Sequence, residues 1–233
     1  MKTSLIIPFK NELEYATITM EKAYSYLSNK ALDFELIAVD DSTDGTWETL
    51  ELFVKKHPNT RVIKGGTPPG YGKALRKGFE MATGDILISF NGDMCDSLDD
   101  VYSYIHHIES GYDMVFGSRY MAGGKIIDHP SLKVLFSKIG NGFLAFLFGV
   151  RCTDITNTFK AYRRKVIEDV NPQSDGYDLG LELALKAVIK GYKYTTIPVI
   201  WYAREYGVSK MSVLKSLKTH LFTGLKIRLT YKG

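Results

Sequence analysis

The sequence has few cysteines and no long apolar segment. Its 233 residues include two cysteines, Cys95 and Cys152, which form no spacing motif, so a disulfide scaffold and a cysteine-based zinc site are excluded. No run of 18 or more apolar residues occurs, and we expect no membrane-spanning helix. The N-terminal run Thr3–Pro8 is too short for a signal peptide and has no cleavage site. We therefore expect a protein of the reducing cytoplasm.

Acidic residues are missing from the C-terminal segment. Residues 206–233 contain six of the 30 basic residues and no Asp or Glu, which leaves the preceding chain slightly acidic. We expect residues 212–233 to form a basic amphipathic helix, centred on about 213–229. An unbalanced cationic segment of this kind indicates an anionic partner, which is a membrane surface, a nucleic acid or a phosphorylated substrate.

Strand and helix patterns alternate through the first half. Short apolar runs at 3–7, 34–39, 61–63 and 86–90 predict strands, and the intervening segments have helical spacing. Asn11 is a favourable N-cap for the first of these helices. Alternation of this type predicts an α/β fold, a Rossmann-like and mostly parallel sheet flanked by helices.

The predicted central strand, 86–90, ends in Asn91, Gly92 and Asp93. Open α/β sheets bind ligands beyond the carboxyl ends of their strands. Gly92 allows a ligand to approach the backbone closely, and Asp93 is an oxygen donor suited to Mg²⁺ or Mn²⁺. The alternative is a tight turn with a solvated Asp.

Two further polar loops and a glycine-rich loop follow the other strands. Glu12 comes after the first strand, and Asp40 and Asp41 after the second, so these acidic groups should converge on one crevice, where Asp40 can accept from a base or ribose. The glycine-rich loop, 65–73, lacks the spacing of a P-loop and of Gly-x-Gly-x-x-Gly. A Walker-type NTPase and a typical nicotinamide enzyme are therefore not supported, and an ordinary surface loop is the alternative.

The second half is less regular. A strand at 113–116 leads into Gly-Ser-Arg-Tyr at 117–120, and apolar residues at helical spacing predict a helix over 131–150. That helix either packs in the core or meets lipid. We expect a further helix at 179–190 and a strand pair at 194–201 that is broken at Pro198.

Taken together, these segments resemble the inverting family 2 glycosyltransferases of the GT-A fold, most closely the dolichyl-phosphate mannosyltransferase and polyprenyl-phosphate glycosyltransferase branch. The resemblance runs from Ser4 to about Met211 and rests on the order and spacing of the motifs. They are Pro-Phe-Lys-Asn-Glu at 8–12, Asp-Asp-Ser-Thr-Asp-Gly-Thr at 40–46, Gly-Tyr-Gly-Lys at 70–73, Asn-Gly-Asp at 91–93, Gly-Ser-Arg-Tyr at 117–120, Asp-Ile-Thr-Asn-Thr-Phe-Lys-Ala-Tyr-Arg-Arg at 154–164 and Arg-Glu-Tyr-Gly-Val-Ser-Lys at 204–210.

The resemblance implies roles for individual residues. Asp93 and Asn91 occupy the Asp-x-Asp position and would hold Mg²⁺ or Mn²⁺ on the donor diphosphate, while Arg204 and Lys210 belong to a loop that closes over it. Asp93, Arg204 and Lys210 are the expected catalytic residues. The expected donor-binding residues are Pro8, Glu12, Asp40, Asp41, Lys73, Asn91 and Gly92. The expected acceptor-binding residues are Arg119, Lys133 and Asp154.

The acceptor class follows from a missing base. An alcohol acceptor needs a general base, and relatives with such acceptors usually carry Glu-Asp at the start of the late helix, which here reads Gly-Tyr-Asp-Leu-Gly-Leu-Glu-Leu at 176–183. A phosphate acceptor is already anionic and needs positioning alone, by Arg119 and Lys133. The helix over 131–150 would receive an isoprenoid chain, with the basic C-terminal helix on anionic lipid.

Two departures from the family pattern matter. Asn91 replaces the first Asp of Asp-x-Asp, and Cys95 stands where a Gln often assists the metal, so we expect weaker metal binding or an altered metal preference. Asn157 and Thr158 replace Ser-Gly, which would reshape the acceptor side. An inactive protein that binds nucleotide sugar without turnover is an alternative.

The sequence thus predicts a metal-dependent hexosyltransferase that uses a GDP-mannose or UDP-glucose type donor and a polyprenyl or dolichyl phosphate acceptor. The alternative is a transfer to a saccharide hydroxyl in polysaccharide or glycolipid synthesis, with Asp154 or Asp178 as base. We expect a catalytic domain at 1–211, with a nucleotide-sugar half at 1–117 and an acceptor half at 118–211. Membrane contact should be peripheral, at the cytoplasmic face, or supplied by a partner subunit. No nucleic-acid-binding module is recognisable.

Overall fold

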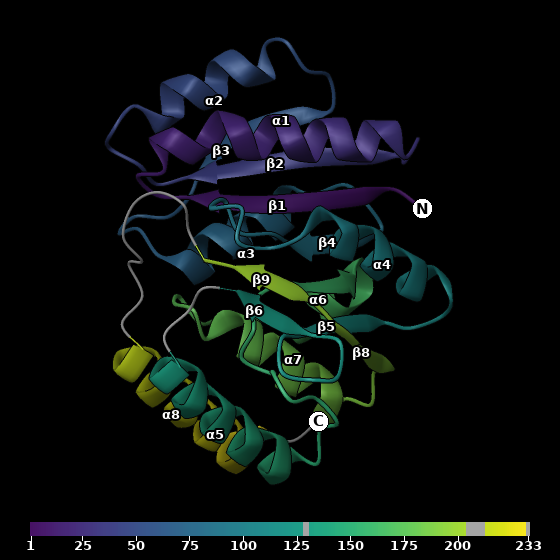
Figure 1. The fold of residues 1–233 in the computed structure, drawn as a ribbon, viewed down its shortest axis with the longest axis vertical. Helices are drawn as coiled ribbons and strands as arrows, with labels where there is room; N and C mark the ends of the chain where they lie inside the picture. The colour runs from purple at the N-terminus through teal and green to yellow at the C-terminus, as the bar shows by residue number, and fades with distance from the viewer. Residues whose placement is uncertain (128–130, 204–212, 232–233) are drawn as a thin grey trace.

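A seven-stranded sheet forms the centre of the protein (Figure 1). The computed structural model describes residues 1–127, 131–203 and 213–231, with the side chains of 131–133 and 213–214 left out. The strands of this sheet, in the order β3-β2-β1-β4-β7-β5-β8, are β1 (Thr3–Phe9), β2 (Phe34–Asp40), β3 (Thr60–Lys64), β4 (Ile86–Ser89), β5 (Met114–Ser118), β7 (Lys160–Arg163) and β8 (Tyr194–Pro198).

The sheet is mostly parallel, as the alternation of strands and helices predicts. β1 pairs in parallel with β2 and β4, β2 with β3, and β5 with β8. β7 lies antiparallel between β4 and β5, so a strand from late in the chain joins the two halves of the sheet. A separate two-stranded sheet pairs β6 (Lys125–Ile127) with β9 (Ile200–Tyr202).

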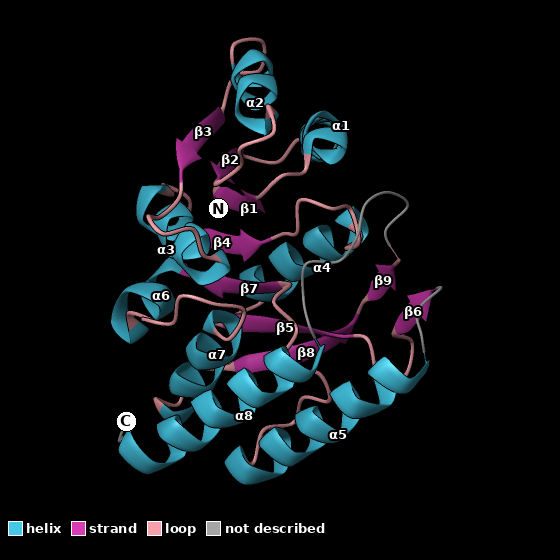
Figure 2. Ribbon diagram, turned by 90° about the vertical axis from the view of Figure 1, so that its left-hand side faces the viewer, coloured by secondary structure: helices cyan, strands magenta, loops and turns pink. Residues whose placement is uncertain are grey.

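Helices cover both faces of the sheet (Figure 2). One face carries α1 (Leu13–Asn29), α2 (Thr46–Val54) and α4 (Leu98–Glu109), and the other carries α3 (Tyr71–Met81), α6 (Arg164–Val170) and α7 (Leu179–Ile189). Successive residues of a strand point to opposite faces, so a strand covered on both sides is apolar throughout.

β1 illustrates this burial on both faces. Leu5 and Ile7 pack in the core beneath α1, and Ile6, between them, packs in the core beneath α3. All three side chains have no exposed surface. The continuous apolar runs that marked the strands in the sequence therefore have a direct structural cause.

Two helices lie side by side at one end of the molecule (Figures 1 and 2). α5 (Ser131–Phe148) packs against α8 (Val213–Thr230), which also packs against α7. The Thr223 hydroxyl donates to Asp178 Oδ2 at 2.8 Å, and His220 Nε2 lies 3.3 Å from the Tyr177 carbonyl oxygen. The expected C-terminal helix is confirmed. Within the residues that the structure describes, no helix is both long and apolar enough to cross a bilayer.

The start of the first helix differs from the prediction. α1 begins at Leu13, and Glu12, rather than Asn11, occupies the N-cap position. Asn11 has a left-handed backbone (φ 50°) and accepts a hydrogen bond from the Thr43 backbone N–H at 2.9 Å. The Asn11 side chain thus joins the loops after β1 and β2 instead of capping α1.

Candidate functional site

The loops after β1, β2 and β4 meet at one edge of the sheet. Since these three strands are parallel neighbours, their carboxyl ends point the same way. Asp41 N–H donates to the Phe9 carbonyl at 3.0 Å, and the Thr19 hydroxyl donates to the Gly92 carbonyl at 2.9 Å. The added Cβ of any other residue at 92 would lie 2.9 Å from the Pro8 carbonyl oxygen, so glycine lets the turn after β4 pack against the end of β1.

Asp40, the last residue of β2, and Asp41, which follows it, have different surroundings. Asp40 is completely buried: its Oδ1 accepts from Ser42 at 2.5 Å, and its Oδ2 lies 3.6 Å from Lys64 Nζ. Within the described chain, Oδ2 accepts no hydrogen bond. Asp41 is half-buried. Asp41 and Ser42 are therefore more accessible than Asp40 to a ligand at this edge of the sheet.

Asp41 also holds the glycine-rich loop. Its carboxylate accepts backbone N–H groups from Gly70 and Gly66, while burial, the larger effect, raises its pKa. On its other side the loop packs against 174–176, where a Cβ at Gly72 would lie 2.5 Å from the Ser174 carbonyl oxygen. Lys73 lies in the first turn of α3, directly after the loop; its Nζ donates to the Pro68 carbonyl at 3.2 Å and lies 3.6 Å from Asp175.

The Asn91 side chain is held from two sides. Its Nδ2 donates to Asp96 Oδ2 at 2.7 Å, and its Oδ1 accepts from the Tyr71 hydroxyl at 2.9 Å. The Tyr71 ring stacks on that of Tyr177, with 4.6 Å between the centroids. Asp93 lies in the same turn, where its Oδ1 accepts from the Cys95 backbone N–H at 3.2 Å.

Asp96 is a buried carboxyl group, 3% exposed, within this turn. Burial, and then the negative charge of Asp93, raise its pKa to about 7, and the positive charge of Arg119 acts in the opposite direction. Two carboxylates that lie close together are stabilised by a cation between or beside them. The Asp93 carboxylate and the amide oxygen of Asn91 are oxygen donors of the kind that suits Mg²⁺ or Mn²⁺.

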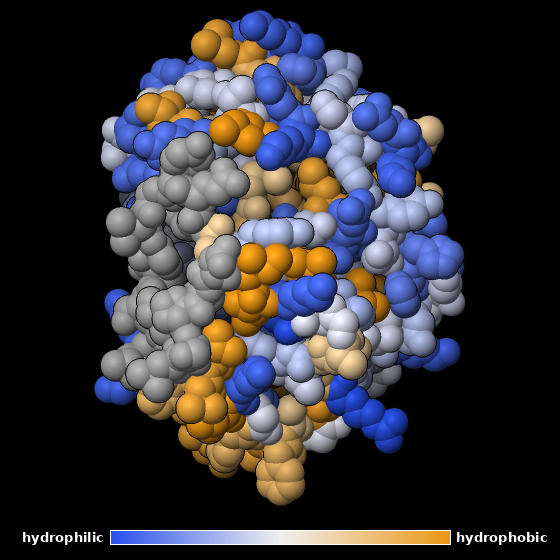
Figure 3. All heavy atoms as spheres, in the orientation of Figure 1, coloured by the Kyte–Doolittle hydropathy of each residue, from blue (hydrophilic) through white to orange (hydrophobic). Residues whose placement is uncertain are grey.

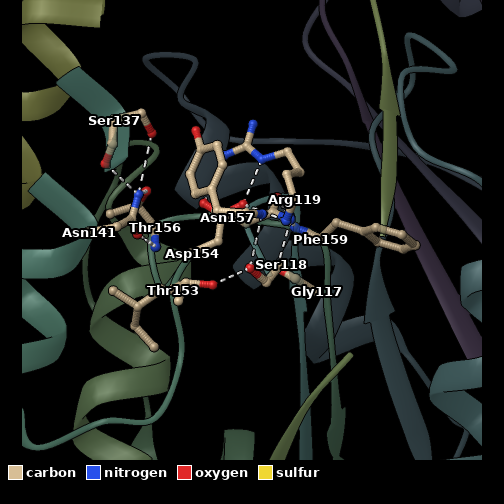
Figure 4. A network of polar contacts seen from close by, with 12 residues as sticks. Gly117, Ser118, Arg119, Ser137, Asn141, Thr153, Asp154, Thr156, Asn157 and Phe159 are labelled. Carbon is tan, nitrogen blue, oxygen red and sulfur yellow. Dashed lines mark hydrogen bonds and ion pairs between the residues drawn. The ribbon is translucent and has the colours of Figure 1, made fainter. Parts of the chain in front are cut away.

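Arg119 forms a bidentate ion pair with Asp154 (Figure 4). Nε donates to Oδ2 at 2.7 Å, Nη2 donates to Oδ1 at 2.9 Å, and the Arg119 backbone N–H donates to Oδ2 at 3.1 Å. Asp154 has no exposed surface, whereas the Arg119 side chain is 19% exposed. Burial alone would lower the pKa of Arg119, but the Asp154 charge raises it. Arg119 is therefore a fixed, permanently charged guanidinium.

The loop that carries Asp154 is itself fixed from several sides (Figure 4). Asn141 of α5 bonds both to the Thr156 backbone N–H, at 2.9 Å, and to the Thr156 hydroxyl, at 3.0 Å. Asn157 Nδ2 donates to the Gly117 carbonyl at 3.1 Å. The fully buried Lys160 donates to the carbonyls of Ile155 and Asn157, and burial lowers its pKa to about 8.

The structure brings some of the predicted site residues together. It places Pro8, Glu12, Asp40, Asp41, Asn91, Gly92 and Asp93 at or beside the carboxyl edge of β1, β2 and β4, with Lys73 in the first turn of α3 after the glycine-rich loop. The positive charge of Arg119 interacts electrostatically with Asp96, which lies in the turn that contains Asn91 and Asp93. The expected residues Arg204 and Lys210, and the side chain of Lys133, lie outside the part described.

Sequence reasoning missed Asp96 and Tyr71. Asp96 stands three residues after Asp93, a spacing that puts a second carboxyl group into the same turn. Tyr71 lies within the glycine-rich loop motif, but the sequence carries no signal that its hydroxyl reaches Asn91. Asp154 was expected to bind the acceptor; in the structure it is completely buried and forms an ion pair with Arg119.

Comparisons with known proteins agree on one family. The model of glycosyl transferase family 2 matches residues 4–170. A polyprenol monophosphomannose synthase from Mycolicibacterium smegmatis is 29% identical over 219 residues, which cover 91% of this chain and 81% of that protein. A dolichol-phosphate mannosyltransferase from Pyrococcus furiosus is 31% identical over 91% of this chain and 59% of its own length. An undecaprenyl-phosphate mannosyltransferase from Micrococcus luteus is 26% identical over 91% of this chain and 88% of its own length.

Solved structures share the fold. Glucosyl-3-phosphoglycerate synthase from Mycobacterium tuberculosis, in complex with Mn²⁺, UDP and phosphoglyceric acid, superimposes with a TM-score of 0.72 over 100% of this chain and 80% of that one. The same enzyme was solved with Mg²⁺ and UDP, at a TM-score of 0.69. The identities are 17% and 18%, a level at which the likeness establishes the fold alone.

Proposed function

Because the chain belongs to glycosyl transferase family 2, we propose that it moves a hexose from a nucleotide sugar onto the phosphate of a polyprenyl or dolichyl phosphate. The observation that carries the proposal is the Arg119 guanidinium, which the ion pair with Asp154 holds in place. Its positive charge interacts electrostatically with Asp96 in the Asn91–Asp96 turn. The three relatives named for mannosyl transfer to polyprenyl phosphates support this acceptor and favour mannose.

The donor would bind at the carboxyl edge of β1, β2 and β4. Pro8, Glu12 and the Asp40–Ser42 turn lie where the base and ribose are expected. The glycine-rich loop, with Lys73 directly after it, is fixed by Asp41 on one side and by 174–176 on the other. Asp93 and Asn91 would hold Mg²⁺ or Mn²⁺, which, when bound, neutralises charge on the diphosphate. Arg204 and Lys210 remain the proposed cationic residues of the closing loop.

The acceptor would bind beside Arg119. A guanidinium presents five N–H donors, and within the described residues two of them are bonded to Asp154, so three would be available to a phosphate. The Asp154 carboxylate keeps the side chain in one orientation before the phosphate arrives, which lowers the cost of ordering it on binding. A phosphate oxygen would then attack the anomeric carbon, as the bond from that carbon to the nucleoside diphosphate breaks. The products are a hexosyl phospholipid and a free nucleoside diphosphate, and no proton needs to be removed.

Transfer to a saccharide hydroxyl is the competing function, and it requires a general base. Both oxygens of Asp154 are bonded to Arg119, and the residue has no exposed surface. Asp178 is 8% exposed and accepts from Thr223. Neither carboxyl group is presented to a substrate, and this burial supports the phosphate acceptor.

An apolar surface with basic residues supports docking at an anionic membrane surface. Figure 3 shows hydrophobic side chains gathered at the lower end of the molecule, where Figure 1 places α5 and α8. The exposed apolar residues of these helices are Leu135, Phe136, Ile139, Phe143, Phe146, Phe222, Leu225 and Leu229. Exposed basic residues of the same helices are Lys138, Lys215, Lys218, Lys226 and Arg228. Such a surface suits the interface of an anionic bilayer, and a cytoplasmic face is the proposed location.

The test is a donor and acceptor panel. The purified protein is incubated with Mg²⁺ or Mn²⁺, GDP- and UDP-hexoses, and either polyprenyl phosphate or a saccharide acceptor. We expect a hexosyl polyprenyl phosphate by mass spectrometry, lost on chelation and in Asp93→Ala. Product on the saccharide alone would overturn the acceptor class. Nucleotide binding without turnover on any acceptor would overturn the catalytic proposal.

A further inference from the structure

Asn91 poses a chemical problem for a metal site. As a neutral amide it offers a cation less negative charge than a carboxylate does. The structure places a second carboxyl group directly against it: Asp96 Oδ2 accepts from Asn91 Nδ2 at 2.7 Å and from the Asn91 backbone N–H at 3.3 Å. Both hydrogen bonds use Oδ2, and within the described residues none reaches Oδ1.

We propose that Asp96 is a positioning residue that makes Asn91 a metal ligand. This inference rests on the proposed function of the same site. The carboxylate accepts from the amide NH₂ group, fixes which side of the amide faces the cation, and draws electron density toward the amide oxygen. Asp96 thereby supplies, through Asn91, the negative charge that position 91 lacks.

Three features of the structure favour this role. The Asn91 amide can be oriented in one way only, because a carboxylate contacts its nitrogen and the Tyr71 hydroxyl contacts its oxygen. Tyr71 uses one of the two lone pairs of Oδ1, and the other can face a cation. Asp96 is 3% exposed, and a buried carboxyl group needs such a hydrogen-bonded partner.

The Asp96 backbone is fixed as well. Asp96 forms a β-bridge with Trp201 of β9, and the neighbouring Cys95 carbonyl accepts from the Tyr202 backbone N–H at 2.9 Å. The carboxylate is thus held between β9 and the Asn91 turn, rather than on a free loop. Outer partners of metal ligands that are held in this way typically change metal affinity about 10–100-fold when they are replaced.

The experiment measures Mn²⁺ affinity, by the electron paramagnetic resonance signal of free Mn²⁺, at saturating GDP or UDP. We expect Asp96→Asn to weaken Mn²⁺ binding about 10–100-fold. Asp100→Asn is the matched control, because Asp100 is a nearby carboxyl group that also contacts the 200–202 segment, through the Ile200 N–H at 3.2 Å, without touching Asn91. This control should retain wild-type affinity.

A double variant separates charge supply from simple structural support. Asn91→Asp combined with Asp96→Asn returns a carboxylate to position 91 and should regain most of the lost Mn²⁺ affinity. Wild-type affinity in Asp96→Asn, or no recovery in the double variant, would overturn the role of Asp96 and leave the transferase proposal standing. No Mn²⁺ binding by the wild type with either nucleotide would overturn the metal site itself and this inference with it.

Discussion

The guanidinium of Arg119 meets the carboxylate of Asp154 through two parallel hydrogen bonds, of 2.7 Å and 2.9 Å. Asp154 is completely buried and Arg119 is partly exposed, so the positively charged member of the pair is the one that a ligand can contact. Such a group recognises an anion by geometry as well as by charge.

Replacing Arg119 with Lys tests the geometry. The variant keeps the charge but loses the planar fork, and a charge-assisted hydrogen bond contributes about 1.5–3 kcal/mol, equivalent to roughly 10–100-fold in affinity. We expect the KM for polyprenyl phosphate to rise by that factor while the KM for the nucleotide sugar is unchanged. A rise in both KM values alike would contradict the assignment of Arg119 to the acceptor.

Gly72→Ala tests the packing of the glycine-rich loop. The added Cβ would lie 2.5 Å from the Ser174 carbonyl oxygen and 2.8 Å from that of Gly176, so the start of α3 and segment 174–176 must separate. We expect a loss of stability of about 1–3 kcal/mol and a raised KM for the donor. Gly142→Ala on α5 is the control, because its Cβ meets nothing within 4 Å. Unchanged donor kinetics in Gly72→Ala would separate this loop from the donor site.

Glu35 predicts a pH dependence of stability. Burial opposes its ionisation, but hydrogen bonds from Ser4 and Thr83 and the charge of Arg61 outweigh it and lower its pKa from 4.5 to about 2. A lowered folded-state pKa stabilises the fold fully above the unfolded-state value, and this contribution is lost as the pH falls from about 5 towards 2.

The corresponding measurement is urea unfolding of Glu35→Gln at pH 7 and at low pH. Lowering the pKa of Glu35 from 4.5 to about 2 corresponds to about 3 kcal/mol, so the variant should be less stable by roughly that amount at pH 7, with the difference shrinking as the pH falls. Glu48→Gln, on the exposed side of α2, is the control. A difference that stays constant with pH would contradict an ionised Glu35.

Docking at a membrane is tested by sedimentation with anionic vesicles. Phe146, Phe222 and Leu229 are 88%, 70% and 80% exposed, and each apolar side chain moved from water into lipid contributes about 1.5–3 kcal/mol. The triple replacement by Ser should strongly reduce binding, and high salt should weaken binding of the wild type. Leu52→Ser on α2, 59% exposed at the opposite end, should have no effect. Equal losses in both variants would place the contact elsewhere.

The fold was predictable where burial leaves a simple pattern. The parallel strands β1, β2 and β4 are buried on both faces, and turn residues bound them, so their apolar runs stand out in the sequence. β7 escaped this reasoning because it reads Lys-Ala-Tyr-Arg, yet Lys160 is buried and bonded to the carbonyls of Ile155 and Asn157. The sequence analysis did not predict α4, although the sequence carries signals for it. The Ser97 side chain accepts a hydrogen bond from the Asp99 backbone N–H as an N-cap, and the buried residues of the helix follow helical spacing.

The site was predictable as a set of loops but not as a set of contacts. Parallel topology brings the ends of β1, β2 and β4 together whatever the side chains are, so the position of Asp93 follows from the sheet. The pairing of Asn91 with Asp96 and Tyr71 depends on rotamers and on a neighbouring helix, which no local pattern encodes. The burial of Asp154 behind Arg119 likewise appears only in three dimensions.

The most direct test of the proposed function compares two acceptors that differ in one group. Polyprenyl phosphate and the polyprenol of the same chain length are offered to the protein with GDP-mannose and Mn²⁺, and products are identified by mass spectrometry. We expect a mannosyl polyprenyl phosphate from polyprenyl phosphate and no product from polyprenol, because Arg119 is partly exposed and can bind a phosphate, whereas Asp154 and Asp178, the candidate bases for a hydroxyl, are buried. A mannosyl polyprenol formed at a comparable rate would contradict this expectation.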